Sequence, residues 1–195
     1  MIKQAWTALR VLLILTVVLG IGYPLVITGI GQAAFSAQAN GSLVRVDDEV
    51  VGSSLIGQSF TDADGNALPE WFQSRPSAAG DGYDGAASSG SNYGPENEEL
   101  IAAIEARRAA IEALDGATDI PADALTASGS GLDPHISPEY AILQVERVAD
   151  ARGLDATVVR ELVESMIQGR DLGYLGEPTV NVLQLNLALA QLDPQ

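Results

Sequence analysis

The most prominent pattern in the chain is a run of apolar residues near its N-terminus. Residues 11–30 (VLLILTVVLGIGYPLVITGI) contain no charged side chain over 20 positions. As a helix, this run spans about 30 Å, the thickness of the hydrocarbon core of a bilayer. Trp6 and Tyr23 lie near its two ends, and aromatic side chains favour the membrane interface. The pattern predicts one transmembrane helix over residues 11–30.

This apolar run contains helix-perturbing residues and has one rival interpretation. Gly20, Gly22 and Pro24 lie within it, and we expect them to kink the helix, which membrane helices tolerate when neighbouring helices satisfy the freed backbone groups. Residues 37–39 (AQA) offer the small-x-small pattern of a cleavage site, which would make the run a signal peptide. The apolar part of a signal peptide is about 7–15 residues long. The greater length of this run favours a retained anchor.

The pattern changes after the apolar run. Residues 31–49 are predicted to be a connecting segment, and residues 50–195 a single domain. Val50–Phe60 mixes β-branched residues with glycines, which is typical of a strand and its turns. The following stretch, residues 61–94, is rich in Gly, Ser, Asp and Asn, as flexible linkers are. It also contains Trp71, and aromatic residues are depleted in disordered segments, so we expect an irregular but folded surface.

Helical periodicity returns in the second half of the domain. A helix is predicted from Pro95-Glu96 to Gly116, and a second from Ser137-Pro138-Glu139 to Gly153, with a serine cap and an early proline. A third begins at Asp155 and ends near Gly169. Residues 180–190 are compatible with a strand or a helix, and we favour a helix, because a helix capped by Asn181 gathers the apolar side chains into one stripe. The predicted fold class is α+β, with one transmembrane helix and a domain of several helices and a few short strands.

Charge predicts the orientation of the chain. Lys3 and Arg10 precede the apolar run, and no further basic residue occurs until Arg45. The positive-inside rule therefore places residues 1–10 in the cytoplasm and the domain outside the inner membrane. All 26 acidic residues lie beyond position 46, and eight basic residues occur from Arg45 onward, which leaves the region from Arg45 a formal charge of −18. Such a surface repels nucleic acid and anionic lipid headgroups.

The only histidine lies in a glycine-rich stretch that resembles a catalytic site. Residues 128–138 (SGSGLDPHISP) bring together Ser130, Asp133 and His135, the residue types of a hydrolytic triad. A triad needs its groups within hydrogen-bond reach, usually from separate loops, but Asp133 and His135 flank Pro134 and no G-x-S-x-G elbow is present. The pattern favours a turn that leads into a helix, and we predict that His135 is not a catalyst.

Phosphate and metal sites have less support. The SGSG stretch lacks the G-K-[ST] ending of a P-loop, and no lysine follows Lys3, although a loop of backbone N–H groups can still hold an anion. The chain has no cysteine, one histidine and no EF-hand spacing, so we predict no metal site. A pair of carboxylates that hydrolyses glycosides stays possible, because the sequence has many acidic residues but nothing in it selects a particular pair.

Arg75, in the stretch WFQSRPSA, is interpreted as a structural residue. We expect it to be buried and to bind backbone carbonyls or a carboxylate of the domain, rather than to contact a bound ligand.

Several blocks together resemble the C subunit of the Kdp potassium-transporting P-type ATPase of bacteria and archaea. They occur in the family's order and cover nearly the whole chain. They are YPLVITGIGQ (23–32), GSSLIGQSF (52–60), WFQSRPSA (71–78), SGSNYGPENEEL (89–100), SGSGLDPHISPEYA (128–141), QVERVADARGL (144–154) and LGEPTVNVLQLNLAL (175–189).

The resemblance selects a set of motif positions, which we interpret as structural or interface residues rather than catalytic ones. In the domain they are Arg75, Pro76, Ser77, Ser91, Asn92, Ser128, Ser130, Asp133, His135, Gln144, Arg147 and Asn181. In the membrane span they are Gly22, Tyr23 and Pro24, which are expected to pack against neighbouring helices.

The resemblance implies a non-catalytic, single-span subunit of an ATP-driven potassium uptake pump. The implied partners are a channel-like potassium-translocating subunit, the P-type ATPase catalytic subunit and a small single-span subunit, within a lipid bilayer. Potassium ion and ATP are handled by the complex, and no cofactor is expected on this chain itself. The family's C subunit is needed for assembly and activity, and it has been assigned a role in raising the affinity of the pump for ATP.

The assigned role and the predicted topology conflict, because a domain outside the cell cannot touch cytoplasmic ATP. We therefore expect the domain to contact the channel-like subunit at its outer mouth. Two other function classes stay open. One is an independent, membrane-anchored ligand-binding module, and the other is an anchored hydrolase that uses Ser130, Asp133 and His135.

Overall fold

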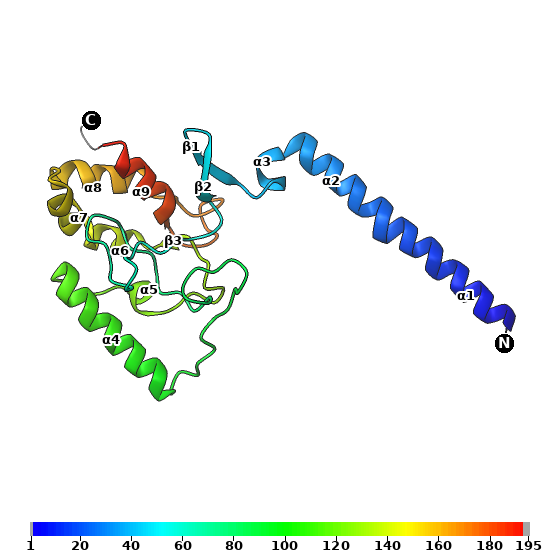
Figure 1. Cartoon of the computed structure of the whole chain (residues 1–195), viewed down its shortest axis with the longest axis horizontal. Coiled ribbons are helices and arrows are strands. Elements are labelled where there is room, and N and C mark those ends of the chain that lie inside the picture. Colours follow the sequence, from blue (N-terminus) through cyan, green and yellow to red (C-terminus); the bar gives the residue numbers. More distant parts are fainter. Residues whose placement is uncertain (1, 193–195) are drawn as a thin grey trace. The chain divides into compact units, whose positions relative to one another are not determined.

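The structure is a computed structural model that describes residues 2–192 (Figure 1). It contains two compact units, one up to Ser53 and the other from Ser54 onward. The N-terminal unit holds the apolar helix and a β-hairpin. The second unit holds the remaining helices, two short strands and the hydrophobic core.

The apolar helix runs through three consecutive segments, α1 (Ile2–Leu15), a π-helical segment η1 (Thr16–Gly22) and α2 (Tyr23–Ala34). It extends beyond the predicted residues 11–30 at both ends. Its apolar side chains are exposed. Among the residues that the structure describes, it is the one helix long and apolar enough to cross a membrane.

The disruption predicted at Gly22 and Pro24 takes the form of a π-helical turn. The backbone N–H of Tyr23 donates to the carbonyl of Val18, five residues earlier. Pro24 has no N–H to donate and its ring crowds the carbonyl four residues before it, so a wider turn on the N-terminal side relieves both problems. The sequence therefore located this irregularity correctly.

A short helix, α3 (Ser36–Ala39), precedes an antiparallel hairpin of β1 (Leu43–Val46) and β2 (Glu49–Ser53). Asp47 and Asp48 form its turn with positive φ angles, the conformation that lets a two-residue turn follow the twist of the strands. Strand β1 lies in the stretch expected to be only a connection. Strand β2 covers the first part of the strand predicted over Val50–Phe60.

The second unit confirms the predicted α+β class. Its helices are α4 (Glu98–Asp115), α5 (Ala122–Leu125), α6 (Pro138–Leu143), α7 (Val145–Arg152), α8 (Ala156–Ser165) and α9 (Val182–Ala190). Strands β3 (His135–Ile136) and β4 (Val180–Asn181) form a two-stranded antiparallel pair. Residues 180–190 are thus mostly helical, as predicted.

The predicted helix caps are confirmed with local differences. Ser137 Oγ accepts from the N–H of Tyr140, and Asp155 and Asn181 cap α8 and α9 in the same way. Helix α4 begins after Asn97 rather than at Pro95, because the Asn97 side chain accepts from two backbone N–H groups.

Two predicted helices have different lengths in the structure. The helix expected from Ser137 to Gly153 is divided at Gln144 into α6 and α7. Helix α8 ends at Ser165 rather than Gly169, because the backbone of Gln168 pairs with Thr179.

The core is formed by buried residues of α4–α9, β3 and β4 and also takes in one aromatic residue of the irregular segment. Phe72 is fully buried, so the expectation that residues 61–94 are folded is correct. Asn186 accepts from Phe72 N–H and donates to Phe72 C=O, both at 2.9 Å. Gln144 makes the same two bonds to Gln73, at 2.6 and 3.2 Å. Two amide side chains therefore satisfy the backbone of this segment, where a neighbouring strand would otherwise do so.

Candidate functional site

The glycine-rich stretch that contains the histidine is a meeting point for distant segments of the domain. Ser128 N–H donates to Pro76 C=O at 3.2 Å, and Ser77 Oγ donates to Gly131 C=O at 2.6 Å. Gly131 has φ +69°, and a Cβ there would lie 2.6 Å from the carbonyl oxygen of Ser89. Glycine is therefore required at this position both by the backbone angle and by the close approach.

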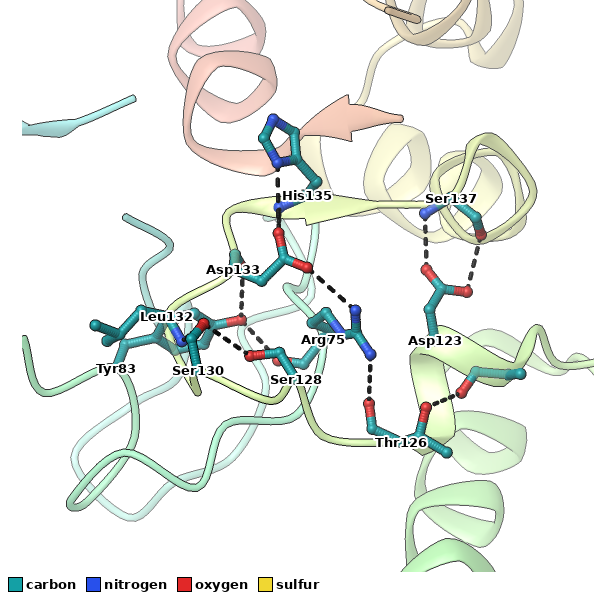
Figure 2. A network of polar contacts seen from close by, with 11 residues as sticks. Arg75, Tyr83, Asp123, Thr126, Ser128, Ser130, Leu132, Asp133, His135 and Ser137 are labelled. Carbon is teal, nitrogen blue, oxygen red and sulfur yellow. Dashed lines mark hydrogen bonds and ion pairs between the residues drawn. The ribbon is translucent and has the colours of Figure 1, made fainter. Parts of the chain in front are cut away.

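Asp133 lies at the centre of this site (Figure 2). Its Oδ2 is 3.1 Å from Arg75 Nη1, and its Oδ1 accepts from the backbone N–H of His135 at 3.0 Å. His135 Nδ1 also lies 3.4 Å from Oδ1. Burial alone would raise the pKa of Asp133, but the hydrogen bonds from His135 and the charge of Arg75 outweigh it and hold that pKa below its ordinary value.

Arg75 makes the kind of contacts predicted for it. Besides Asp133, it donates from Nη2 to the carbonyl of Thr126 at 3.3 Å. Its own carbonyl accepts from the Tyr83 hydroxyl at 2.7 Å. Burial raises the pKa of Tyr83 to about 12, so this hydroxyl stays protonated and donates near neutral pH. Arg75 Nε is buried and has no hydrogen-bond partner within the described residues.

The geometry does not assemble a hydrolytic triad. Ser130 Oγ accepts from the N–H of Leu132 at 3.1 Å and lies 3.5 Å from Ser128 Oγ. Across residues 2–192 it makes no hydrogen bond to His135. A serine nucleophile needs its base within hydrogen-bond reach. Asp133 and His135 are thus paired without a nucleophile.

The same loop is poorly suited to bind an anion. The N–H groups of Ser128, Gly131, Leu132 and His135 are all engaged by other atoms of the domain. An anion-binding loop needs several free N–H groups that point toward one spot. The Asp133 carboxylate adds a negative charge beside them.

Asp123, which lies outside the sequence motifs, fixes the start of α6. Its two carboxylate oxygens accept from the N–H and the hydroxyl of Ser137, at 2.7 and 2.9 Å (Figure 2). Ser137 in turn caps the helix through Tyr140. The segment that carries His135 is therefore anchored at one end by Arg75 and Asp133, and at the other by Asp123.

A cleft of about 680 Å³ opens beside this segment, and we call it the acidic cleft. Its ionisable lining consists of five carboxylates, one guanidinium and the imidazole. These residues are Asp119, Asp123, Asp133, Glu139, Glu177, Arg75 and His135. Within residues 2–192 no three acidic or histidine side chains gather closely enough to hold a metal ion. The ionisable lining of the cleft therefore carries a net negative charge.

Gln144 and Arg147 belong to a second, separate cluster. Arg147 Nε is 2.7 Å from Asp115 Oδ1, and Nη2 donates to Gln144 Oε1 at 2.7 Å. Nη1 donates to the carbonyls of Pro69 and Trp71, at 2.5 and 3.0 Å. We call this group the arginine clamp, since it holds the irregular segment against α4 and α7. Burial raises the pKa of Asp115, although Arg147 acts to lower it.

The remaining motif positions are dispersed. Asn181 caps α9 with its oxygen and donates from Nδ2 to Ser54 C=O at 2.9 Å. Ser91 and Asn92 lie on an exposed loop, where Asn92 Nδ2 donates to the carbonyl of Gly90. Gly22, Tyr23 and Pro24 are exposed on the apolar helix. The structure thus gathers the positions around Asp133 but does not bring the whole set into one site.

Comparison with known proteins covers almost the entire chain. Residues 5–191 match the family model described as "KdpC: K+-transporting ATPase, c chain". A protein of Kineococcus radiotolerans is 54% identical over 100% of this chain and 96% of its own length. One of Caulobacter vibrioides is 56% identical over 89% and 86%, and one of Mycobacterium tuberculosis is 52% identical over 97% and 99%. Each of the three is named a potassium-transporting ATPase KdpC subunit.

Proposed function

Because this chain belongs to the KdpC family, the c chains of K+-transporting ATPases, we propose that it is a non-catalytic, single-span subunit of an ATP-driven potassium uptake pump. The proposal is supported by the similarity of this chain, over nearly its whole length, to proteins that are named KdpC subunits of potassium-transporting ATPases. The proposed partners are the channel-like subunit, the P-type catalytic subunit and a small single-span subunit. Potassium and ATP are then handled by these partners, and this chain binds no cofactor of its own.

The bonding around Asp133 supports a non-catalytic role. Asp133 and Arg75 bind to one another, and Ser130 Oγ bonds within its own loop. These groups hold together segments that are distant in the sequence, which is a folding role. A domain built in this way offers a rigid surface to partner proteins, and such a surface helps a complex to assemble without any reaction on the domain itself.

The distribution of charge supports an extracytoplasmic domain. Lys3 and Arg10 precede the apolar helix, and the acidic residues all follow it. The positive-inside rule favours a cytoplasmic N-terminus for such a chain. The domain then meets the channel-like subunit at its outer mouth and stabilises the complex from there. An effect on the affinity for ATP, if this chain has one, is transmitted through the partner subunits.

Purification of the complex tests this function. The affinity-tagged full chain, extracted in mild detergent, is expected to carry an ion-translocating subunit and a P-type ATPase with it. Potassium-stimulated ATPase activity is expected in membranes that contain this chain and to be lost when its gene is deleted. A chain that purifies alone, with full ATPase activity in its absence, would show that the proposal is wrong.

Cysteine labelling tests the orientation separately. The chain has no cysteine, so one introduced on the exposed face of the domain, as in Glu105→Cys, is the only thiol of this chain that a membrane-impermeant reagent can label. Labelling is expected in intact cells. Labelling only after permeabilisation would place the domain in the cytoplasm and revive direct contact with ATP.

One observation favours an alternative, a membrane-anchored ligand-binding module. The acidic cleft has a volume of about 680 Å³, within the range of small-molecule sites. Under this alternative the chain functions without partner subunits. The same purification distinguishes the two, because a module of this kind would extract without a P-type ATPase.

A further inference from the structure

The loop between α8 and β4 exposes a group of large apolar side chains. Leu172, Tyr174 and Leu175 keep 82%, 69% and 49% of their surfaces exposed, and we call them the apolar tip. Elsewhere in described residues 54–192, large exposed apolar side chains occur singly or as the pair Leu55 and Ile56. Neighbouring exposed apolar residues of this size are typical of an interaction site.

The apolar tip is held in place by the backbone beneath it. Asp171 and Leu175 exchange two hydrogen bonds, both of 2.9 Å, which close the loop just below its end. Gln168 and Thr179 exchange two more, of 2.8 and 3.0 Å, at its base. Leu172 adopts φ +52°, an unfavourable angle for leucine that the closed loop imposes. The tip is therefore presented in one ordered conformation, which lowers the entropy lost on binding.

The same loop continues into the acidic cleft. Glu177 and Thr179, at the base of the loop, line the cleft, and Glu177 forms an ion pair with Arg170. Asp119 and Glu139 lie in the same lining, and within residues 2–192 neither carboxylate makes a hydrogen bond or an ion pair. The surface thus combines a preformed apolar contact with carboxylates that lack a cationic partner.

We propose that the apolar tip and the acidic cleft together dock an extracytoplasmic segment of a partner subunit, one in which apolar side chains adjoin lysine or arginine. Apolar residues of that segment cover Leu172 and Tyr174, and its basic side chain pairs with Asp119 and Glu139. This inference rests on the proposed function and adds the surface through which it operates. Charge complementarity selects the occupant, because a second copy of this acidic chain or an anionic lipid surface would be repelled.

Site-specific photocrosslinking in the assembled complex tests the proposal. A photoreactive phenylalanine analogue replaces Tyr174 in the otherwise unchanged full chain, expressed with its partner subunits. Illumination is expected to give one covalent product with a partner subunit. The same analogue at Ile101, an exposed apolar position on α4, is the matched control and is expected to give at least tenfold less of that product.

Substitutions test the two halves of the surface. Leu172→Asp and the pair Asp119→Lys/Glu139→Lys are each expected to lower the yield of the Tyr174 crosslink about tenfold, as the loss of an interface hot spot does. Glu105→Lys/Glu112→Lys changes two exposed charges on α4 and is expected to leave the yield unchanged. Trp71 fluorescence of each purified chain, in a Trp6→Phe background, confirms that each variant retains the folded domain.

The outcomes separate this inference from the function on which it rests. If the chain co-purifies with no partner subunit, the proposed function is wrong. If the chain co-purifies with its partners, but the analogue at position 174 crosslinks only to lipid, to a second copy of this chain or to nothing, the proposed docking surface is wrong while the proposed function stands. An equal yield from position 101, or yields unaffected by Leu172→Asp and by the charge reversal, overturns it as well.

Discussion

Two arginine–aspartate pairs in the domain, both centred on motif positions, differ in how completely they are buried and bonded. Arg147 and Asp115 keep 7% and 2% of their side chains exposed, and every guanidinium nitrogen of Arg147 donates a hydrogen bond. Arg75 and Asp133 keep 22% and 31% exposed, and Arg75 Nε has no partner within the described residues. The first pair forms the arginine clamp, and the second lines the acidic cleft.

This difference separates a role in stability from a role at a surface. A buried ion pair whose donors all make hydrogen bonds holds the segments that it joins in one arrangement. Removing one partner leaves the other as an uncompensated charge in a low-dielectric interior. A pair that borders a cleft stays within reach of water, which screens it. The pKa directions agree, since burial raises the pKa of Asp115 whereas hydrogen bonds and Arg75 lower that of Asp133.

Breaking the arginine clamp is expected to have the largest effect. Arg147→Met leaves Asp115 without its partner and should lower the free energy of unfolding by about 3–5 kcal/mol. Urea unfolding of the full chain in detergent, followed by Trp71 fluorescence in a Trp6→Phe background, measures the loss. The double variant Arg147→Met/Asp115→Leu should recover part of it, because no buried charge is then left unpaired.

The matched control for this prediction is an exposed pair. Arg160 Nη2 lies 3.5 Å from Glu146 Oε1, and both side chains are largely exposed. Arg160→Met should change the free energy of unfolding by less than about 0.5 kcal/mol. Equal losses in Arg147→Met and Arg160→Met would contradict the distinction between buried and exposed pairs.

Removing an amide that holds the irregular segment is expected to have the second largest effect. Asn186→Leu leaves the N–H and C=O of Phe72 without their partner in a fully buried place. The expected loss is about 2–3 kcal/mol in the same urea experiment. Gln184→Leu, two residues earlier on α9, serves as the control and should cost under about 0.5 kcal/mol. A loss in Asn186→Leu no larger than in the control would show that these bonds contribute little.

The Arg75–Asp133 pair at the acidic cleft should make the stability of the domain depend on pH. The pKa of Asp133 is lowered in the folded state, so its contribution to stability is complete above the unfolded value of about 3.9 and is lost as the pH falls through the folded value. The urea concentration at which half of the unaltered chain is unfolded should therefore be lower at pH 3 than at pH 6. Asp133→Asn should show a smaller fall, and Glu105→Gln, an exposed change on α4, the same fall as the unaltered chain. An identical fall in Asp133→Asn would contradict the shift.

Local chemistry explains which parts of the domain were predictable. Ser137, Asp155 and Asn181 each satisfy backbone N–H groups two or three residues away, so their capping roles follow from adjacent sequence. The periodicity of residues 180–190 allowed a strand or a helix, and the apolar stripe of a helix capped by Asn181 correctly favoured the helix. Strand β1 was missed, because a strand depends on its partner and the Asp47-Asp48 turn is not a strong hairpin signal.

The clusters themselves are long-range, and the sequence could not reveal them. Asp115 and Arg147 are 32 positions apart, and Phe72 and Asn186 are 114 apart. Asn186 had one signal, a polar residue within the apolar stripe of α9, which indicates a buried partner. The family blocks included Gln144 and Arg147 but gave no means to separate them from Arg75 and His135. Only the burial and bonding of each side chain make that separation.

The smallest effect is expected where the sequence most resembles a catalytic site. Ser130→Ala removes one hydroxyl whose bonds, to Leu132 N–H and Ser128 Oγ, lie at the rim of the loop. The free energy of unfolding should change by less than about 0.5 kcal/mol, and potassium-stimulated ATPase activity of the complex should stay within twofold of that of the unaltered complex. His135→Ala should likewise preserve the activity and destabilise only modestly, since the Asp133–Arg75 pair remains. Loss of activity in both variants, with the fold and the subunit composition intact, would instead support a reaction on this chain.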